Sequence, residues 1–224
     1  MLKKLILRQE IKEMLIGYIC SDQVKQGERL SLPDLAQDLG VSATPIREAL
    51  TQLYESGIVT YIANRGFFVA ELGREEANEV YQLMGTLECE AIRDIEYDDK
   101  ALKKLSKINA EMAKASSSNE TLLFDRKFHQ ELIRDYRNQT AHKIIEDLRV
   151  KVVLYEYAFW SDDIADDSVP AHQRIIDHLA SGDKAAAIDA LRDNWLVSIE
   201  SMVATLPVEM TPEARSAKPN SKYR

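Results

Sequence analysis

Apolar residues recur at helical spacing along most of this chain, and turn-forming residues separate the stretches that carry them. In the first third, the pattern predicts helices over about 5–21, 31–39 and 43–55. Ser31, followed three residues later by Asp34, matches a helix-capping pattern and marks the start of the second helix. Two short β-rich runs then flank Ala63-Asn64-Arg65-Gly66, which predicts a β-hairpin over 58–70.

The remainder of the chain is helical in pattern and predicts a second domain. Six helices are expected there, at about 74–95, 98–115, 119–136, 138–160, 168–180 and 183–205, with a polar break at 162–167. Three helices followed by a hairpin are typical of a winged helix-turn-helix. We therefore predict a mainly α protein, with a winged helix-turn-helix domain at 1–72 and an all-helical bundle at 73–206. The tail at 207–224 is rich in Pro, Ser, Lys and Thr, which predicts disorder.

Composition narrows the class of protein. Of the 224 residues, only eight are glycine and six proline, which suits a helical fold. No apolar run is long enough for a membrane span, and the charged start does not resemble a signal peptide, so we expect a cytoplasmic protein with no membrane partner. Cys20 and Cys89 are isolated and are expected to be buried, reduced thiols. Residues 1–70 carry eight basic and eight acidic side chains, so the net charge of −8 belongs to the second part.

The segment from Gly40 to Leu50 predicts a helix that reads DNA. Gly40 can end the preceding helix in a left-handed conformation, Ser42 or Thr44 can cap the next one, and Pro45 suits its first turn. In a winged helix-turn-helix this third helix enters the major groove, and the hairpin tip reaches the DNA backbone or the minor groove. The residues expected to contact DNA are Ser42, Ala43, Thr44, Pro45, Arg47 and Thr51 in the helix, and Asn64, Arg65 and Gly66 in the wing.

Four segments of the chain resemble the N-terminal domain of GntR-type bacterial transcription regulators, and the resemblance extends over about residues 7–72. They are Glu28-Arg29-Leu30-Ser31, Leu39-Gly40-Val41-Ser42, Thr44-Pro45-Ile46-Arg47-Glu48-Ala49-Leu50 and Asn64-Arg65-Gly66-Phe67-Phe68-Val69. The resemblance implies a homodimer that binds a palindromic operator, more often as a repressor. Ala43 stands where members usually carry an arginine that reads guanine, so base readout is expected to depend on Arg47 and Thr44.

A second group of polar residues occurs on the apolar faces of the predicted bundle. Asp125 and His129 are four residues apart and share one helix face, His172 opens a later helix, and Asn194 lies in the last one. Carboxylate and imidazole groups that face a bundle interior are costly to bury unless they are paired or bind a metal. From spacing alone, a paired Asp and His in the core is the commoner explanation.

The second part also resembles the FadR-like effector domain, the FCD branch of these regulators. The matching features are Asp-x-x-x-His at Asp125 and His129, the later His172, and a polar residue in the last helix. This resemblance implies a divalent metal, with Zn²⁺ or Ni²⁺ expected, held by Asp125, His129 and His172. Asn194 stands where a histidine is typical and would be a weaker fourth ligand. The family also implies a small-molecule effector, expected to be a carboxylate, at this metal.

The effector pocket is the least determined part of the prediction. Many members pair the effector with an arginine in the first helix of this domain, where this chain has Met84 or Gly85. Arg134, Arg149 and Arg93 are candidates to substitute for it, and Tyr155 and Trp195 are candidates for the pocket wall.

Two alternative functions are weighed against the regulator. A metal-dependent hydrolase could use Asp125, His129 and His172 to activate water, but it needs a general base, and Glu131 lies on another side of the helix from His129. A metal-free regulator that binds acyl-CoA would not need the Asp and His set. We therefore predict a regulator that is not an enzyme.

Overall fold

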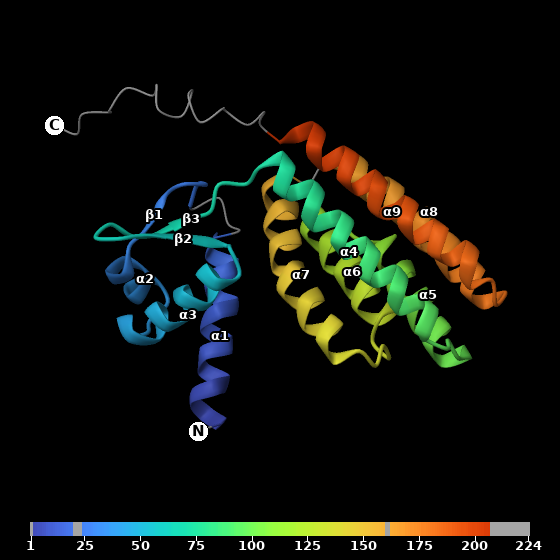
Figure 1. Cartoon of the computed structure of the whole chain (residues 1–224), viewed down its shortest axis with the longest axis horizontal. Coiled ribbons are helices and arrows are strands. Elements are labelled where there is room, and N and C mark those ends of the chain that lie inside the picture. The colour runs from blue at the N-terminus through green and yellow to red at the C-terminus, as the bar shows by residue number, and fades with distance from the viewer. Residues whose placement is uncertain (1, 20–23, 160–161, 207–224) are drawn as a thin grey trace.

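The computed structural model describes residues 2–19, 24–159 and 162–206 and consists of helices with one small sheet (Figure 1). The first part, which we call the head, comprises α1 (Leu2–Ile19), β1 (Arg29–Leu30), α2 (Leu32–Asp38), α3 (Ala43–Glu55), β2 (Val59–Ile62) and β3 (Gly66–Val69). Its sheet is antiparallel in the order β1-β3-β2. The predicted winged helix-turn-helix is confirmed as a fold, with an additional strand.

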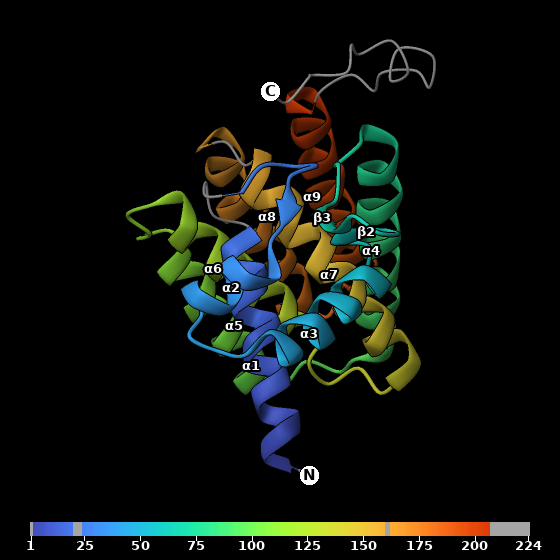
Figure 2. The same cartoon turned by 90° about the vertical axis from the view of Figure 1, so that its left-hand side faces the viewer.

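The second part, which we call the bundle, comprises α4 (Arg74–Asp94), α5 (Asp99–Met112), α6 (Ser118–Leu132), α7 (Gln139–Phe159), α8 (Asp162–Ala180) and α9 (Lys184–Thr205). Helix α4 packs against α7 and α9, α8 packs against α5 and α9, and α6 packs against α5. Figure 1 shows the head at one side of the bundle, and Figure 2 shows it in front of the bundle after a quarter turn. The mainly α fold class is confirmed.

Local sequence signals explain where most elements begin. The Ser31 hydroxyl accepts a hydrogen bond from the Asp34 amide at 3.5 Å, as the capping pattern predicts. Asp98, Ser117 and Asp183 cap α5, α6 and α9 in the same manner. Gly40 has a φ of 65°, the left-handed conformation that ends α2. Ser42 precedes α3 without a side-chain cap bond, so only its backbone conformation marks this start.

Two features differ from the sequence prediction, and two predictions fall on residues outside the described ranges. Strand β1 was not predicted; it pairs Arg29 and Leu30 with Phe68 and Phe67 of β3. The predicted break at 162–167 is helical and forms the first turns of α8. Aspartates are favourable at a helix start, where they compensate the partial positive charge of free amides. The tail at 207–224 and Cys20 lie outside the described residues, whereas Cys89 is buried and free.

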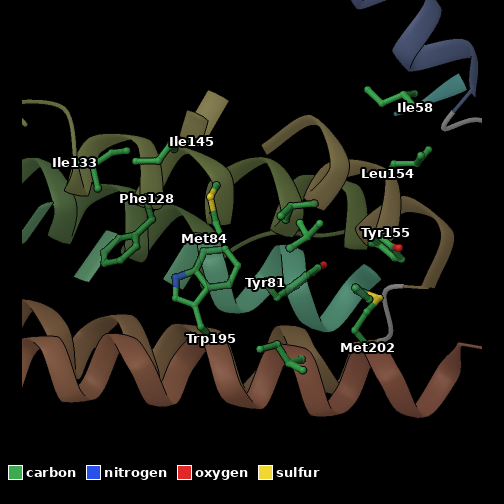
Figure 3. Close-up of a cluster of buried hydrophobic side chains, with 14 of the residues drawn as sticks. Ile58, Tyr81, Met84, Phe128, Ile133, Ile145, Leu154, Tyr155, Trp195 and Met202 are labelled. Carbon is green, nitrogen blue, oxygen red and sulfur yellow. The ribbon is translucent and has the colours of Figure 1, made fainter. Parts of the chain in front are cut away.

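One cluster of buried apolar side chains continues from the head into the bundle. Figure 3 shows it extending from Ile58 past Leu154 and Tyr155 to Trp195 and Phe128. This continuity places the head directly against α7. None of the helices in the described ranges is both long and apolar enough to cross a membrane.

Candidate metal centre and DNA-reading surface

Helix α3 presents a buried face to the head and a polar face to solvent. Its core side consists of Ile46, Ala49, Leu50 and Leu53. Thr44, Arg47 and Thr51 are exposed on the opposite side, as the sequence predicts. The Thr51 hydroxyl donates a hydrogen bond to the Arg47 carbonyl at 2.8 Å, so this hydroxyl is already engaged within the helix. Arg47 is therefore the exposed group on this face with the most free hydrogen-bond donors.

The wing tip lies between β2 and β3 and depends on two left-handed residues. Asn64 has a φ of 62° and Gly66 a φ of 95°, which together form the tight connection. Asn64 and Arg65 are exposed. The Arg65 guanidinium lies over the Phe68 ring, 5.3 Å from its centroid, an arrangement that favours one orientation of the cation.

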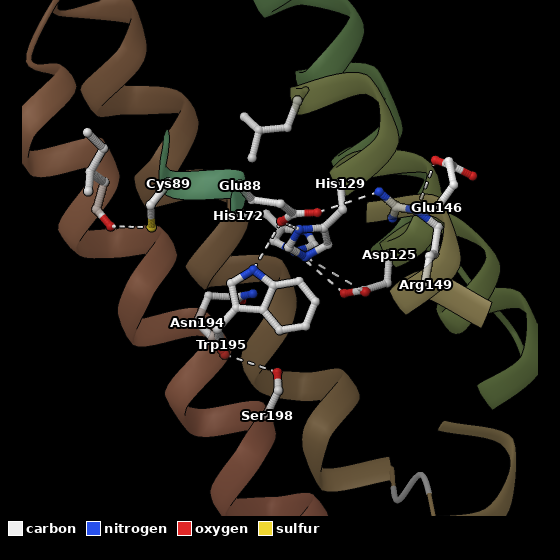
Figure 4. Close-up of polar contacts among 12 residues, drawn as sticks. Glu88, Cys89, Asp125, His129, Glu146, Arg149, His172, Asn194, Trp195 and Ser198 are labelled. Carbon is white, nitrogen blue, oxygen red and sulfur yellow. Dashed lines mark hydrogen bonds and ion pairs between the residues drawn. The ribbon is translucent and has the colours of Figure 1, made fainter. Parts of the chain in front are cut away.

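Asp125 and His129 of α6 meet His172 of α8 inside the bundle. The His172 Nε2 lies 3.5 Å from Asp125 Oδ1, and the His129 Nε2 lies 3.9 Å from Asp125 Oδ2. One ligand atom from each residue can be chosen so that all three lie within 4.8 Å of one another. All three residues are buried, and Figure 4 shows them converging between the helices. One carboxylate and two imidazoles form a donor set that suits a divalent transition metal.

His172 has the properties of a metal ligand. Its ring stacks on Phe128 with centroids 3.8 Å apart and planes 8° apart, which fixes its orientation. Neither ring nitrogen has a hydrogen-bond partner within the described part of the chain, an arrangement that is costly for a buried polar group. Burial, and then the nearby His129, hold the pKa of His172 well below its usual range. The imidazole is therefore neutral, with a lone pair available for a cation.

Glu88 of α4, which the sequence analysis did not identify, orients this site. Its carboxylate is fully buried, with Oε2 2.7 Å from His129 Nδ1 and 3.0 Å from Trp195 Nε1, which donates to it. A carboxylate accepts hydrogen bonds, so Nδ1 carries a proton, and Nε2, which faces Asp125, is the nitrogen that could bind a cation once it is deprotonated. Burial alone would lower the pKa of His129, but the charge and hydrogen bond of Glu88, together with Asp125, raise it.

Two carboxyl groups in the same region are difficult to ionise without a cation. Burial raises the pKa of Asp125, although the neighbouring His129 opposes this. Burial, and then the charge of Asp125, raise the pKa of Glu156 of α7 to about 8. Asp125, His129, Glu156, Asn194 and Trp195 line one small cavity of about 10 Å³. That volume holds about one water-sized group, and a divalent cation there would stabilise the charged forms of both acids.

The four residues predicted for the effector pocket separate in the structure. Trp195 lines the small cavity, and Arg149 is buried with its Nη2 3.6 Å from Glu88 Oε1. Arg134 instead lies on the surface, paired with Glu131 and Asp135, because it sits beyond the end of α6. The Tyr155 hydroxyl donates towards the Gly73 carbonyl and Glu76, so it faces the connection to the head.

The place in α4 where many family members carry an arginine is buried in this chain. Met84 is fully buried, and Gly85 lies against the Trp195 ring. Arg149 is instead the buried arginine that lies beside Glu88. Glu88 and Glu156 could have been suspected from sequence, because each is an acid on the apolar stripe of its helix.

Comparison with known proteins agrees with this architecture. The model of the family described as "Bacterial regulatory proteins, gntR family" matches residues 7–69, and that of the "FCD domain" matches residues 79–195. The chain is 28% identical over 170 residues to the HTH-type transcriptional regulator YdhC of Bacillus subtilis. The aligned residues cover 73% of this chain and 76% of YdhC. It is 31% identical over 142 residues to the Nta operon transcriptional regulator of Aminobacter aminovorans, covering 62% and 66% respectively.

Solved structures share the fold. McbR/YncC of Escherichia coli superposes with a TM-score of 0.73 at 20% identity, covering 88% of this chain and 97% of that one. A GntR regulator from Rhodococcus sp. RHA1 gives a TM-score of 0.74 at 21% identity, covering 89% and 99%. The head and the bundle therefore occur together in other solved chains.

Proposed function

Because this chain belongs to the GntR family of bacterial regulatory proteins and carries an FCD domain, we propose that a small carboxylate bound at a divalent metal controls its affinity for operator DNA. The chain is a DNA-binding transcription regulator, and the named relatives are transcriptional regulators rather than enzymes. The observation that carries the proposal is the buried Asp125, His129 and His172 cluster. We take residues 1–72 as the DNA-binding domain and 73–206 as the effector-binding and dimerisation domain.

At the DNA, α3 enters the major groove, where Arg47 and Thr44 contact bases. Exposure of both side chains on one face of α3 supports this role. Ser42, Ala43, Pro45 and Thr51 approach the same groove, while Asn64, Arg65 and Gly66 of the wing approach the backbone or the minor groove. A homodimer presents two such heads to a palindromic operator, and we take repression as the usual outcome.

In the bundle, Asp125, His129 and His172 hold Zn²⁺ or Ni²⁺. Support comes from the two ring nitrogens of His172, neither of which makes a hydrogen bond among the described residues, and from Glu88, which engages Nδ1 of His129 and so directs Nε2 to the site. Asn194 lines the same cavity and supplies a weak fourth oxygen ligand. When bound, the cation supplies a Lewis-acidic position for one carboxylate of the effector.

The effector itself needs more space than the small cavity offers. A volume of about 10 Å³ admits about one water-sized group, so an organic acid enters only if the surrounding side chains move. Arg149 is the proposed anchor for the second end of the acid, since its Nη2 and Nε lie 3.6 Å from Glu88 and 3.5 Å from Glu146, too far for hydrogen bonds, and can turn to a ligand carboxylate. Trp195 forms part of the wall. We no longer assign Arg134 or Tyr155 to the pocket.

Helix α7 connects the site to the head. Glu156 lines the cavity, and the hydroxyl of the adjacent Tyr155 lies 3.0 Å from both the Gly73 carbonyl and the Glu76 carboxylate, so its single proton is shared between these two acceptors. Lys151 of the same helix pairs with Glu76 and touches Gly57 of the head. A shift of α7 on effector binding would therefore move the linker and the head. Control of DNA affinity requires that the effector bind the DNA-competent and incompetent arrangements with different affinities.

Elemental analysis tests the metal centre. His129→Ala removes a ligand, so the purified variant should contain far less divalent metal than the wild-type protein after dialysis against Zn²⁺ or Ni²⁺. His142→Ala is a matched control, because His142 is a histidine of the same bundle whose Nε2 bonds the Tyr136 carbonyl. Equal metal content in the wild-type protein and His129→Ala would refute the proposed site.

A further inference from the structure

A groove crosses the head between helix α3, the wing and strand β1. Its volume is about 630 Å³, far larger than the cavity at the metal centre. Arg47 and Tyr54 line it from α3, Tyr61 and Phe67 from the wing strands, and Arg29 from β1. Arg47, Thr51 and Tyr54 lie at helical positions i, i+4 and i+7, so the groove is continuous with the face of α3 that is proposed to read DNA.

The groove is basic although the protein is acidic. Two arginines line it, and no aspartate or glutamate does. Neither Arg29 nor Arg47 has an ion-pair partner within the described ranges. The Nε of Arg29 lies 3.9 Å from the position that a Cβ on Gly66 would occupy, so this guanidinium reaches the start of β3 at the base of the wing tip. Such a surface attracts an anion.

The other wall of the groove is aromatic and open to solvent. Tyr54 and Tyr61 are 50% and 53% exposed and meet edge to face, with ring centroids 6.5 Å apart. Tyr61 also packs on Phe67 at 5.1 Å, which holds its ring upright on the sheet. Exposed tyrosines can pack their rings on sugars and donate hydrogen bonds to phosphates.

We propose that this groove seats one strand of the DNA sugar–phosphate backbone, with Arg29 as a phosphate contact and Tyr54 and Tyr61 against the adjoining sugars. The inference rests on the proposed function: when α3 lies in the major groove and the wing beside it, a backbone strand must pass between them. The two arginines and the exposed tyrosines of the groove suit the phosphates and sugars of that strand. Arg29 then positions the duplex without reading its sequence.

A phosphate contact by Arg29 is important because the head has no net charge. Its residues 1–70 carry equal numbers of basic and acidic side chains, so little general attraction to DNA is available. Loss of one phosphate contact should weaken binding to every sequence by a similar factor. It should also lower the slope of log affinity against log salt concentration by about 0.9.

The test uses the full-length protein and a duplex that the wild-type protein selects from random DNA. Affinity is measured by fluorescence anisotropy at several salt concentrations, for this duplex and for a shuffled duplex of equal length and composition. Arg29→Gln should weaken binding to both duplexes several-fold and lower the salt slope, whereas Arg29→Lys should keep the full slope because it keeps the charge. Arg192→Gln is the matched control, since Arg192 lies on α9 and pairs only with Asp189 among the described residues.

The outcomes are distinct. If Arg29→Gln keeps the wild-type affinity, salt slope and thermal stability, the groove does not bind the DNA backbone through Arg29. The proposed function as a DNA-binding regulator would remain. A loss confined to the selected duplex would overturn the backbone contact too, because Arg29 would then be reading bases. If the wild-type protein selects no duplex at all, the proposed function fails, and this inference fails with it.

Discussion

At the scale of single residues, the Glu88 carboxylate links the groups around the candidate metal centre. It binds His129 and Trp195 by hydrogen bonds and lies beside the Arg149 guanidinium, while its own side chain is fully buried. A buried carboxylate is stable only with such partners. Glu88 therefore decides which nitrogen of His129 faces the ligand position, although it need not touch the metal.

Replacing Glu88 by glutamine tests this positioning role. A neutral amide increases the basicity of His129 less than a carboxylate does. Its terminal nitrogen is also a hydrogen-bond donor, whereas both terminal oxygens of the carboxylate are acceptors. We expect Glu88→Gln to lower metal affinity about 10- to 100-fold, measured by competition with a metal-binding dye. Glu90→Gln, an exposed change on the same helix, should leave the affinity unchanged. A Glu88→Gln variant that binds metal like the wild-type protein would exclude the positioning role.

Residue spacing and family resemblance predicted part of this site. Asp125 and His129 can be paired from their separation of four, and the resemblance added His172 and Asn194. The structure brings Asp125, His129 and His172 together, and Asn194 lines a small cavity with Asp125 and His129. Glu88 and Glu156 come from other helices, and no local spacing links them to Asp125. Arg134 was misplaced because periodicity does not show where α6 ends.

At the scale of elements, the close approach of α4 and α9 depends on Gly85. A Cβ at this position would lie 3.0 Å from Trp195 Cγ and 3.1 Å from Cδ1. The Trp195 ring is buried and donates a hydrogen bond to Glu88, so it cannot move away from α4 without breaking that hydrogen bond. The small residue on α4 thus allows the ring of α9 to reach the metal centre.

Gly85→Ala should therefore destabilise the protein. Alanine gains about 0.5–1 kcal/mol in a helix relative to glycine, but overpacking a core costs about 1–3 kcal/mol, so the second effect should prevail. The midpoint of urea unfolding should fall. Gly17→Ala is the matched control, because nothing lies within 4 Å of a Cβ there, and that change should stabilise α1 slightly. Equal stabilisation by both changes would show that Trp195 is not held against α4.

The helices were predicted well because long apolar stripes identify them. Helix α3 agrees at both ends, since Pro45 and Ser56-Gly57 mark its limits. Strand β1 has only two residues, too few for any periodicity, and it exists because β3 pairs with it. The first turns of α8 were missed because a run of aspartates was interpreted as a loop rather than as a helix start.

At the scale of the whole molecule, the neutral head and the acidic bundle have separate tasks. Because the head has no net charge, we expect its DNA affinity to come from a few specific contacts rather than from bulk charge. The sequence could predict both parts but not how they meet, because Tyr155, Glu76 and Gly73 are brought together by tertiary packing. Through these contacts the metal centre and the DNA-binding surface share helix α7.

The most direct test measures operator affinity with the metal site filled and emptied. The probe is the duplex selected by the wild-type protein, titrated by anisotropy after chelation and again with Zn²⁺ or Ni²⁺ and a panel of di- and tricarboxylic acids. For the wild-type protein we predict a change of roughly 5- to 150-fold with at least one acid, and for His172→Ala the same affinity under both conditions. Arg47→Ala should bind the duplex weakly throughout. An unchanged wild-type affinity, or an equal response in His172→Ala, would contradict control of DNA binding by the metal centre.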